Sequence, residues 1–380
     1  MAARPRDRIW IECDRGRFDR FQHLELSTDV FGEAQCWFTV ADDRAWRTLR
    51  PMLAPGREFR VYCNGLLQFT GRVECNELPT SCDGGTIIQV VLRTRLADAK
   101  VGGADPAVRV SDTTIKQFVL ALYARHGLTE ENFLFSPDAD RDLSTGKKKG
   151  ARDPVDLDAL PAEKAKVQPT ETTFEAAKRH LERHHLMHWD AATGLIVVGI
   201  PSDTQPPFYR FEQRRGVCNF LEARPVRDWA DVPGELWVYG GAVGKDVLRA
   251  PIKGVAVDYD LAIESANTGH FNRRVILSVE GAKDLARANA QARRELAARS
   301  RRKAAWEFDV EGWTFWDGSR ATPYAINTTA DIDVDTHEGT ELRGIFLVTG
   351  VRKSLDVEDG ARTTLTMLAK GLIDPVNANP

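Results

Sequence analysis

The chain has 380 residues, with 52 Lys and Arg against 55 Asp and Glu and a formal net charge of −3. Hydrophobic residues make up 42% and charged residues 28%, as in ordinary globular proteins, so two or three domains could each bury a core. The near-neutral charge argues against a whole-chain nucleic-acid or membrane-surface binder, because either would need a basic excess. No stretch approaches the roughly 18 apolar residues of a membrane span, and the basic start lacks the apolar core of a signal peptide. We therefore expect a protein that folds in a cytoplasm.

The first hundred residues alternate apolar and polar side chains with the period of β-strands. The runs 34–40, 59–63 and 67–75 show this pattern. Asn64-Gly65 lies between the last two runs, and this dipeptide favours a tight type I′ hairpin. With the apolar run 86–92, the pattern predicts five or six short antiparallel strands, enough for a small barrel or sandwich.

The pattern changes after residue 102 to that of a small α/β module. Apolar spacing predicts a helix at 111–126, capped by Ser111, and a second helix at 172–188. A strand follows at 195–200. Residues 136–170 between the helices are polar and contain prolines, which predicts a long exposed loop.

The second half returns to β-structure around one strong helix. That helix is predicted at 281–303, which is rich in Ala, Arg and Leu. Its many basic residues would contact another protein or water; phosphate binding is the weaker alternative, because no base-stacking aromatics are interleaved. The predicted strands are 217–223, 236–239, 274–279, 305–310, 343–353 and 363–368.

The six cysteines show neither a CxxC pair nor zinc-type spacing. Four of them fall in strand-like runs, where a thiol behaves as a small buried hydrophobe. We expect core thiols, with one or more disulfides as the alternative. The six are Cys13, Cys36, Cys63, Cys75, Cys82 and Cys218.

Three histidines are the chain's candidates for metal ligands. His180, His184 and His188 are four residues apart and would share one face of the predicted helix. Imidazoles at this spacing can chelate a metal, but the Glu of a zincin motif and a distant third ligand are both missing. We predict a solvated or partly packed histidine row, and no metal site.

The acidic run Asp331 to Asp335 resembles the start of a calcium-binding loop. Thr336 replaces the turn glycine, however, and Leu342 stands where a bidentate Glu is required. We predict an exposed strand with its acids on one face. Since the chain also lacks a Walker loop, a dinucleotide fingerprint and a GxSxG elbow, we predict no catalytic residues, no cofactor and no enzymatic activity.

A series of short segments, each weak alone, occurs in a distinctive order. They are 61–65 (VYCNG), 69–73 (FTGRV), 93–98 (RTRLAD), 167–174 (VQPTETTF), 195–198 (LIVV), 216–223 (GVCNFLEA), 237–240 (WVYG), 365–368 (LTML) and 373–375 (IDP). In this order the segments resemble the baseplate hub proteins of contractile-tailed phages, especially the Mu-like group. That family is related to the hub part of type VI secretion spike proteins. The resemblance covers most of the chain, but the loop at 136–166 departs from it.

The resemblance implies an α+β fold that is mainly β. It would contain two tube-like antiparallel β-barrel domains and an inserted small α/β module. The first barrel would comprise 1–102 and 203–230, and the inserted module 103–202 with its long loop at 136–170. The second barrel would comprise 231–380, including the helix at 281–303.

The resemblance also implies a structural function. Three copies, each with two barrels, would form a pseudo-sixfold ring that joins a sixfold tail tube to a threefold central spike. DNA would pass through the lumen during ejection without specific binding. The implied partners are further copies of the chain, the tail tube protein, the spike protein and the wedge or other baseplate proteins. The implied location is the virion tail baseplate, assembled in the host cytoplasm, with the spike on a separate chain.

Two other classes of function stay open from the residues alone. One is a tail-associated hydrolase, which only the histidine row supports. The other is a receptor- or carbohydrate-binding protein at the tail tip, for which the nine tryptophans give slight support.

Overall fold

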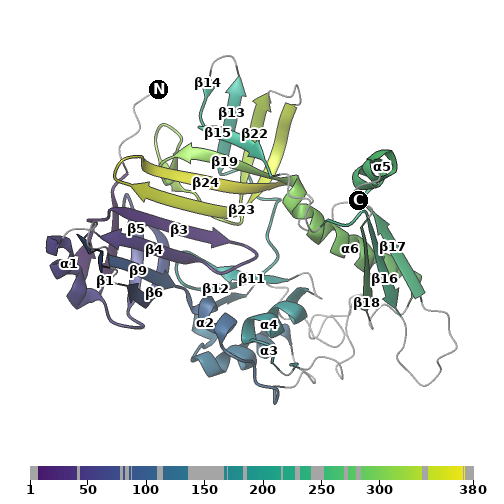
Figure 1. Cartoon of the computed structure of the whole chain (residues 1–380), viewed down its shortest axis with the longest axis horizontal. Coiled ribbons are helices and arrows are strands. Elements are labelled where there is room, and N and C mark those ends of the chain that lie inside the picture. The colour runs from purple at the N-terminus through teal and green to yellow at the C-terminus, as the bar shows by residue number, and fades with distance from the viewer. Residues whose placement is uncertain are drawn as a thin grey trace.

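The computed structural model shows a mainly β protein built around one large antiparallel sheet (Figure 1). This confirms the predicted fold class at that level. None of the helices in the described part of the chain is both long and apolar enough to cross a membrane. The structure describes residues 7–40, 43–77, 80–81, 85–86, 88–108, 114–135, 167–168, 170–182, 186–214, 217–226, 232–240, 252–268, 273–279, 284–335, 341–370 and 372.

The N-terminal region forms one end of the large sheet, with the strand order β3-β4-β9-β6-β5-β1-β2. The predicted hairpin is confirmed: β5 and β6 are antiparallel around Asn64 and Gly65, which have φ angles of 53° and 82°. Strand β9 is central and alternates buried and half-buried residues. The elements are β1 (Ile9–Cys13), β2 (Gly16–Phe18), β3 (His23–Asp29), β4 (Gln35–Val40), α1 (Asp43–Leu49), η1 (Arg50–Met52), β5 (Glu58–Cys63), β6 (Leu66–Glu77), β7 (Thr80–Ser81), β8 (Gly85–Thr86) and β9 (Ile88–Arg93).

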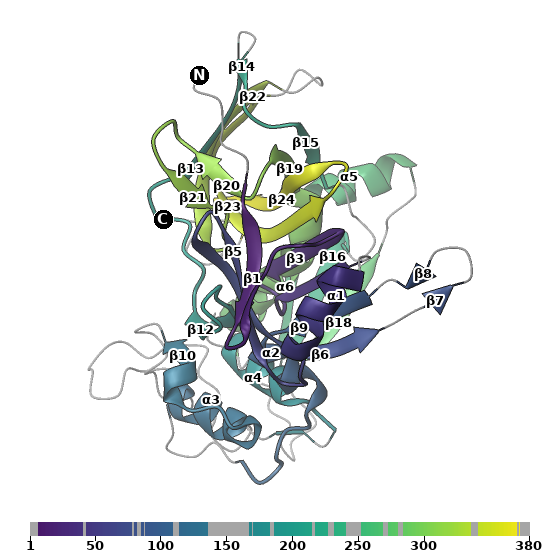
Figure 2. The same cartoon turned by 90° about the vertical axis from the view of Figure 1, so that its left-hand side faces the viewer.

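A small α/β module follows, in which α3 and α4 lie on one side of a three-stranded sheet of order β10-β12-β11 (Figures 1 and 2). Thr114 caps α3 with a full capping box, while the predicted cap Ser111 lies outside the described residues. So does most of the predicted loop 136–170. The elements are α2 (Arg95–Val101), α3 (Ile115–Tyr123), η2 (Ala124–His126), η3 (Glu130–Asn132), β10 (Phe133–Phe135), α4 (Thr173–Glu182), β11 (Met187–Asp190) and β12 (Ile196–Gly199).

The predicted helix at 172–188 is wrong in its second half. Helix α4 ends at Glu182, and the chain then turns into β11, which pairs antiparallel with β12. Strand pairing along four residues, with His188, Trp189 and Asp190 buried, replaces the last helical turn. Tertiary contacts here outweigh the local helical pattern.

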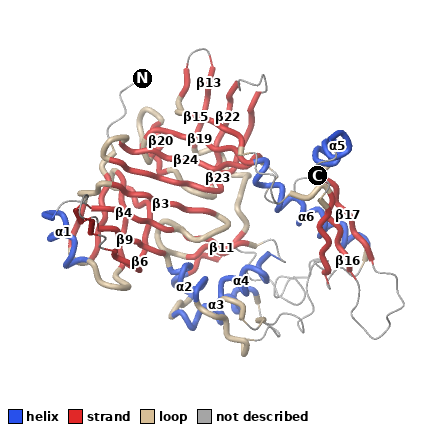
Figure 3. Tube along the Cα trace, viewed as in Figure 1, coloured by secondary structure: helices blue, strands red, loops and turns tan. Residues whose placement is uncertain are grey.

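The C-terminal region forms the other end of the large sheet (Figure 3). The predicted strands at 305–310, 343–353 and 363–368 are confirmed as β19, β23 and β24, whereas β13, β20 and β21 were not predicted. The expected strand at 217–223 is two short strands, β14 and β15, which pair with different neighbours. The elements are β13 (Tyr209–Arg214), β14 (Val217–Cys218), β15 (Glu222–Pro225), β19 (Ala305–Glu311), β20 (Thr314–Trp316), β21 (Ala321–Pro323), β22 (Thr328–Asp335), β23 (Glu341–Asp356) and β24 (Gly360–Ala369).

A separate three-stranded sheet projects to one side of the molecule (Figure 1). Helix α6 covers one face of it, burying Leu236 and Val238 against Ala288 and Ala292. This confirms the predicted helix, which begins after an Asp284 cap. The elements are β16 (Glu235–Gly240), β17 (Ile252–Val257), α5 (Tyr259–Thr268), β18 (Arg274–Val279) and α6 (Leu285–Ala304).

Strand β23 joins the two ends of the large sheet. One of its edges pairs with β24, while the other pairs with β22 up to Val348 and with β3 from Gly350. Fourteen of the described strands thereby form one large sheet on an open path. No closed barrel is present among them, so the division into two barrels stays a prediction.

Four cysteine side chains are described, and none of them forms a disulfide. Cys36 and Cys63 are buried and Cys13 is half-buried, all three in strands, as predicted for core thiols. Cys218 differs because it is exposed.

Candidate functional site: the junctions between modules

Asp190 fastens the α/β module to the large sheet. It ends β11 and is only 2% exposed. Its Oδ2 accepts hydrogen bonds from the Thr94 hydroxyl (2.6 Å) and from the backbone N–H of Ala34 (3.0 Å). Thr94 immediately precedes α2 and Ala34 immediately precedes β4, so a single carboxyl group connects three separate segments. Burial raises the pKa of Asp190 to about 7, and the two hydrogen bonds oppose that rise.

The groups around Asp190 are buried in their neutral forms. Burial lowers the pKa of His188, two residues earlier, to about 3. Burial, and secondarily the charge of Asp190, raises the pKa of Tyr123 well above its usual value. The charges of Glu33 and Lys100, whose side chains lie 3.5 Å apart, have opposite effects on the pKa of Asp190. Burial at this junction therefore favours the uncharged forms of these side chains.

The turn after Asp190 makes a second contact with the large sheet. The Thr70 hydroxyl on β6 donates to the Ala192 carbonyl at 2.9 Å. Gly194 has a φ of 79°, and a Cβ there would lie 3.1 Å from the Thr70 side chain. The β11–β12 turn thus packs closely on β6.

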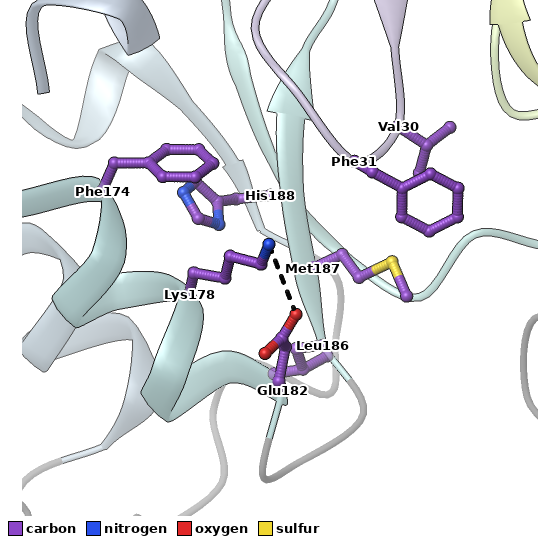
Figure 4. A pocket seen from close by; sticks show the side chains of 8 residues that line it. All are labelled: Val30, Phe31, Phe174, Lys178, Glu182, Leu186, Met187 and His188. Carbon is purple, nitrogen blue, oxygen red and sulfur yellow. Dashed lines mark ion pairs between the residues drawn. The ribbon is translucent and has the colours of Figure 1, made fainter. Parts of the chain in front are cut away.

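A small recess marks where the modules meet (Figure 4). Apolar side chains from the β3–β4 turn, α4 and β11 line it, next to the ion pair of Lys178 and Glu182 at 3.9 Å. The Cζ of Arg301 on α6 lies 5.1 Å from the centroid of the Phe31 ring. Burial raises the pKa of Glu182, and the charges of Lys178 and Arg301 oppose that rise. The recess is apolar and lies beside one ion pair, and its lining is Val30, Phe31, Phe174, Lys178, Glu182, Leu186, Met187 and His188.

The three candidate histidines do not share a helix face. His180 is buried on α4, with its ring 4.7 Å from that of Phe118. His188 is buried on β11 against Phe174. His184 lies outside the described residues. The predicted row on one helix face is therefore wrong, because His188 lies on a strand. Of the two environments predicted, solvated or partly packed, His180 and His188 are packed and not solvated. No group of three metal-ligating side chains is found in the described ranges.

The acidic run lies on β22, as a strand with buried Ile332 and Val334 between the acids. Asp333 pairs with Arg214 (2.6 Å) and Arg343 (3.1 Å). Arg343 also lies 3.7 Å from Asp335, so Asp333 and Asp335 belong to one ion-pair network.

The basic residues of α6 partly contact their own chain. Lys303 forms an ion pair with the buried Asp258, at the start of α5. Arg301 stacks on Phe31 in the β3–β4 turn. The helix therefore connects its own small sheet with the large sheet. The sequence predicts that its basic residues contact another protein or water, and it does not predict these contacts within the chain.

Sequence reasoning missed a buried lysine where the two ends of the large sheet join. Lys353 on β23 is 2% exposed, and its Nζ donates to Oε1 of Gln68 on β6. Burial lowers its pKa to about 7. The available signal was its place in the alternation with Val351 and Leu355, which puts position 353 on the core side.

We compared the chain with known proteins. No protein-family model matches it, and no curated protein matches it in sequence. Solved structures do match. The tail protein of Neisseria meningitidis MC58 is 17% identical, with a TM-score of 0.71 over 97% of this chain and 98% of that one. The chain has the fold of phage tail proteins.

Other solved structures agree. The 43 kDa tail protein of prophage MuSo2 from Shewanella oneidensis is 15% identical, with a TM-score of 0.70 over 96% of this chain and 99% of that one. The structure of a Francisella PdpA-VgrG complex contains a chain with a TM-score of 0.50 and 8% identity, over 96% of this chain and 58% of that one. The predicted resemblance to Mu-like tail proteins is confirmed at the level of the fold.

Replacing Asp190 with Ala should loosen the α/β module. The change leaves the buried N–H of Ala34 without its acceptor, which costs about 1–3 kcal/mol. We expect faster hydrogen exchange in β11, β12 and α4, with β13 and β22 unchanged. Glu131→Ala, an exposed acid in the same module, is the control and should change neither region. Uniform exchange in the Asp190 variant would contradict this role.

Proposed function

We propose that this chain is a structural baseplate hub protein of a contractile phage tail, without enzymatic activity. One observation carries the proposal: the fold of two phage tail proteins matches over at least 96% of this chain and 98% of theirs. The likeness therefore extends across every described module and is not confined to one domain.

In this proposal three copies form a ring with pseudo-sixfold symmetry. Each copy contributes two β-rich regions, which in our division are residues 1–102 with 203–230 and residues 231–380. The α/β module at 103–202 lies outside the ring. Support comes from the pairing of β3 with β23, which holds both β-rich regions of one chain in a fixed relation. Such a ring would join a sixfold tube to a threefold spike.

The proposed partners are the tail tube protein above the ring, the spike protein below it and baseplate wedge proteins around it. DNA would pass through the lumen without being held. The net charge of −3 supports this, because phosphate contacts by Lys and Arg would slow transit. The proposed location is the baseplate of the virion tail.

The proposal predicts a trimer. Native mass spectrometry of the purified protein, with the spike protein added in a parallel sample, should give three times the mass of the chain. Electron microscopy of the same sample should show a ring with a central hole. A chain that stays monomeric with the spike protein present, or a trimer without a hole, would refute the hub assignment.

A further inference from the structure

The outer face of the three-stranded sheet is apolar and uncovered. Trp237 on the central strand β16 lies directly opposite Val255 on β17 and Ile276 on β18, so all three side chains share one face. Val255 is 37% exposed and Ile276 is 59% exposed. Helix α6 packs on the opposite face, where Gly254 touches Ala288. The row formed by Trp237, Val255 and Ile276, which we call the sheet patch, has no covering element among the described residues.

Cations surround the sheet patch. The Nζ of Lys253 lies 3.0 Å from the centroid of the Trp237 ring, and the Cζ of Arg274 lies 3.8 Å from it. The two cations come from strands on either side of β16, so the indole stands between them. In the described parts of these three strands, Glu235, which pairs with Arg274 at 2.9 Å, is the one acid on this face. An apolar centre with basic neighbours fits a partner that presents an apolar side chain flanked by acids.

The turn between β23 and β24 presents such a surface. Val357 is 72% exposed and is followed by the exposed acids Glu358 and Asp359. Asp356 shapes this turn by accepting hydrogen bonds from the backbone N–H of Glu358 (2.9 Å) and from His23 (3.2 Å). The apolar tip is therefore held in place before binding, which lowers the entropy lost on docking.

The two surfaces lie far apart on one chain. Strand β24 ends beside α6, where Leu368 pairs with Ala305, and α6 leads to the small sheet. The acidic turn is at the other end of β24, next to the start of β3. Figure 1 shows the small sheet at one end of the long axis, and the strands β1 and β5 toward the other. One protomer could not bring the two surfaces together, but two protomers could.

We propose that the sheet patch of one protomer binds the acidic β23–β24 turn of a second copy of the chain. Val357 packs against Ile276 and Val255, while Glu358 and Asp359 face Lys253 and Arg274. The contact is head-to-tail, and a rotation of 120° between neighbours closes it into a ring of three. This inference rests on the proposed trimer and identifies the surfaces that build it.

Charge reversal tests the contact. Lys253→Glu places an acid opposite the acidic turn, and Glu358→Lys places a cation opposite the basic face. Each variant should raise the protomer concentration needed for half-maximal assembly by about ten-fold or more, since like charges at an interface oppose binding. The double variant K253E/E358K restores opposite charges and should recover most of the loss. Analytical ultracentrifugation over a dilution series measures all four proteins.

Matched controls separate this effect from loss of fold or of net charge. Arg125→Glu and Glu131→Lys make the same charge changes at exposed sites in the α/β module, and should assemble like the wild type. Circular dichroism melting checks that every variant is folded. The apolar part is tested by Val357→Asp, which should give monomers.

The outcomes distinguish this contact from the wider proposal. A wild-type trimer that persists unchanged in all these variants would overturn the contact and leave the hub assignment standing. Weakening by both single changes without rescue in the double variant would also overturn it. A wild-type monomer with the spike protein present would overturn both, and open filaments would overturn ring closure.

Discussion

Replacing Gly254 with Ala should separate α6 from its sheet. A Cβ at this position would lie 2.1 Å from the backbone carbon of Ala288 and 2.3 Å from its oxygen. Backbone atoms cannot move aside as a flexible side chain can, so the whole helix would have to shift. Overpacking of this kind costs about 3 kcal/mol of unfolding free energy. This destabilisation would act on the small core between α6 and its sheet, formed by Leu236, Val238 and Ala256. Because the core is small, few other contacts would hold the helix in place.

Hydrogen exchange should locate this effect. In the Gly254→Ala protein, amides of α6, β16 and β17 should exchange faster, while β4 and β9 keep their wild-type rates. Gly103→Ala is a matched control, because a Cβ at Gly103 meets nothing within 4 Å and its φ is not positive. Equal stability of the two variants would show that α6 does not pack against Gly254 this closely.

Alkaline pH should stabilise the protein through Lys353. Its pKa is about 7 in the folded protein against an ordinary value of 10.5, because burial disfavours the charged amine. Between these values the unfolded state binds more protons than the folded one, so the free energy of unfolding rises with pH. The rise is about 1.4 kcal/mol per pH unit from one such group. The rise in the free energy of unfolding should be clearest between about pH 7 and 9. Above this range the buried thiol of Cys36, whose pKa burial raises, makes the free energy of unfolding fall as the pH rises.

Urea unfolding followed by tryptophan fluorescence at several pH values measures this slope. Lys353→Met removes the titrating group and should flatten the slope between pH 7 and 9. Lys370→Met, a change at an exposed lysine next to β24, should keep the wild-type slope. If Lys353→Met and the wild type rise in parallel, Lys353 is not the group that titrates.

Local signals predicted much of the fold. Neighbouring residues alone predict the Asn64-Gly65 turn, the strand alternation and the Ala- and Arg-rich helix. The structure confirms these predictions. The failed predictions depended on distant contacts. Residues 183–188 continue a helical spacing of histidines, but pairing with β12 places His188 on a strand.

The junction residues could not be predicted for a similar reason. Asp190 has the sequence context of an ordinary turn residue, and its docking against Thr94 and Ala34, 96 and 156 positions away, buries it. The pairing of β3 with β23 joins segments more than 320 residues apart. No local pattern specifies such a partner, although the alternation around Lys353 indicated that its side chain points inward.

The position of β23 in the sheet has a consequence for synthesis on the ribosome. Strand β3 is made early, but its partner residues 350–356 are made more than 320 residues later. Until then the β3 edge keeps its backbone groups unpaired, and such edges readily recruit other chains. Nascent chains that stop before residue 350 should therefore aggregate or require chaperones, even though every strand of the N-terminal region has already been made.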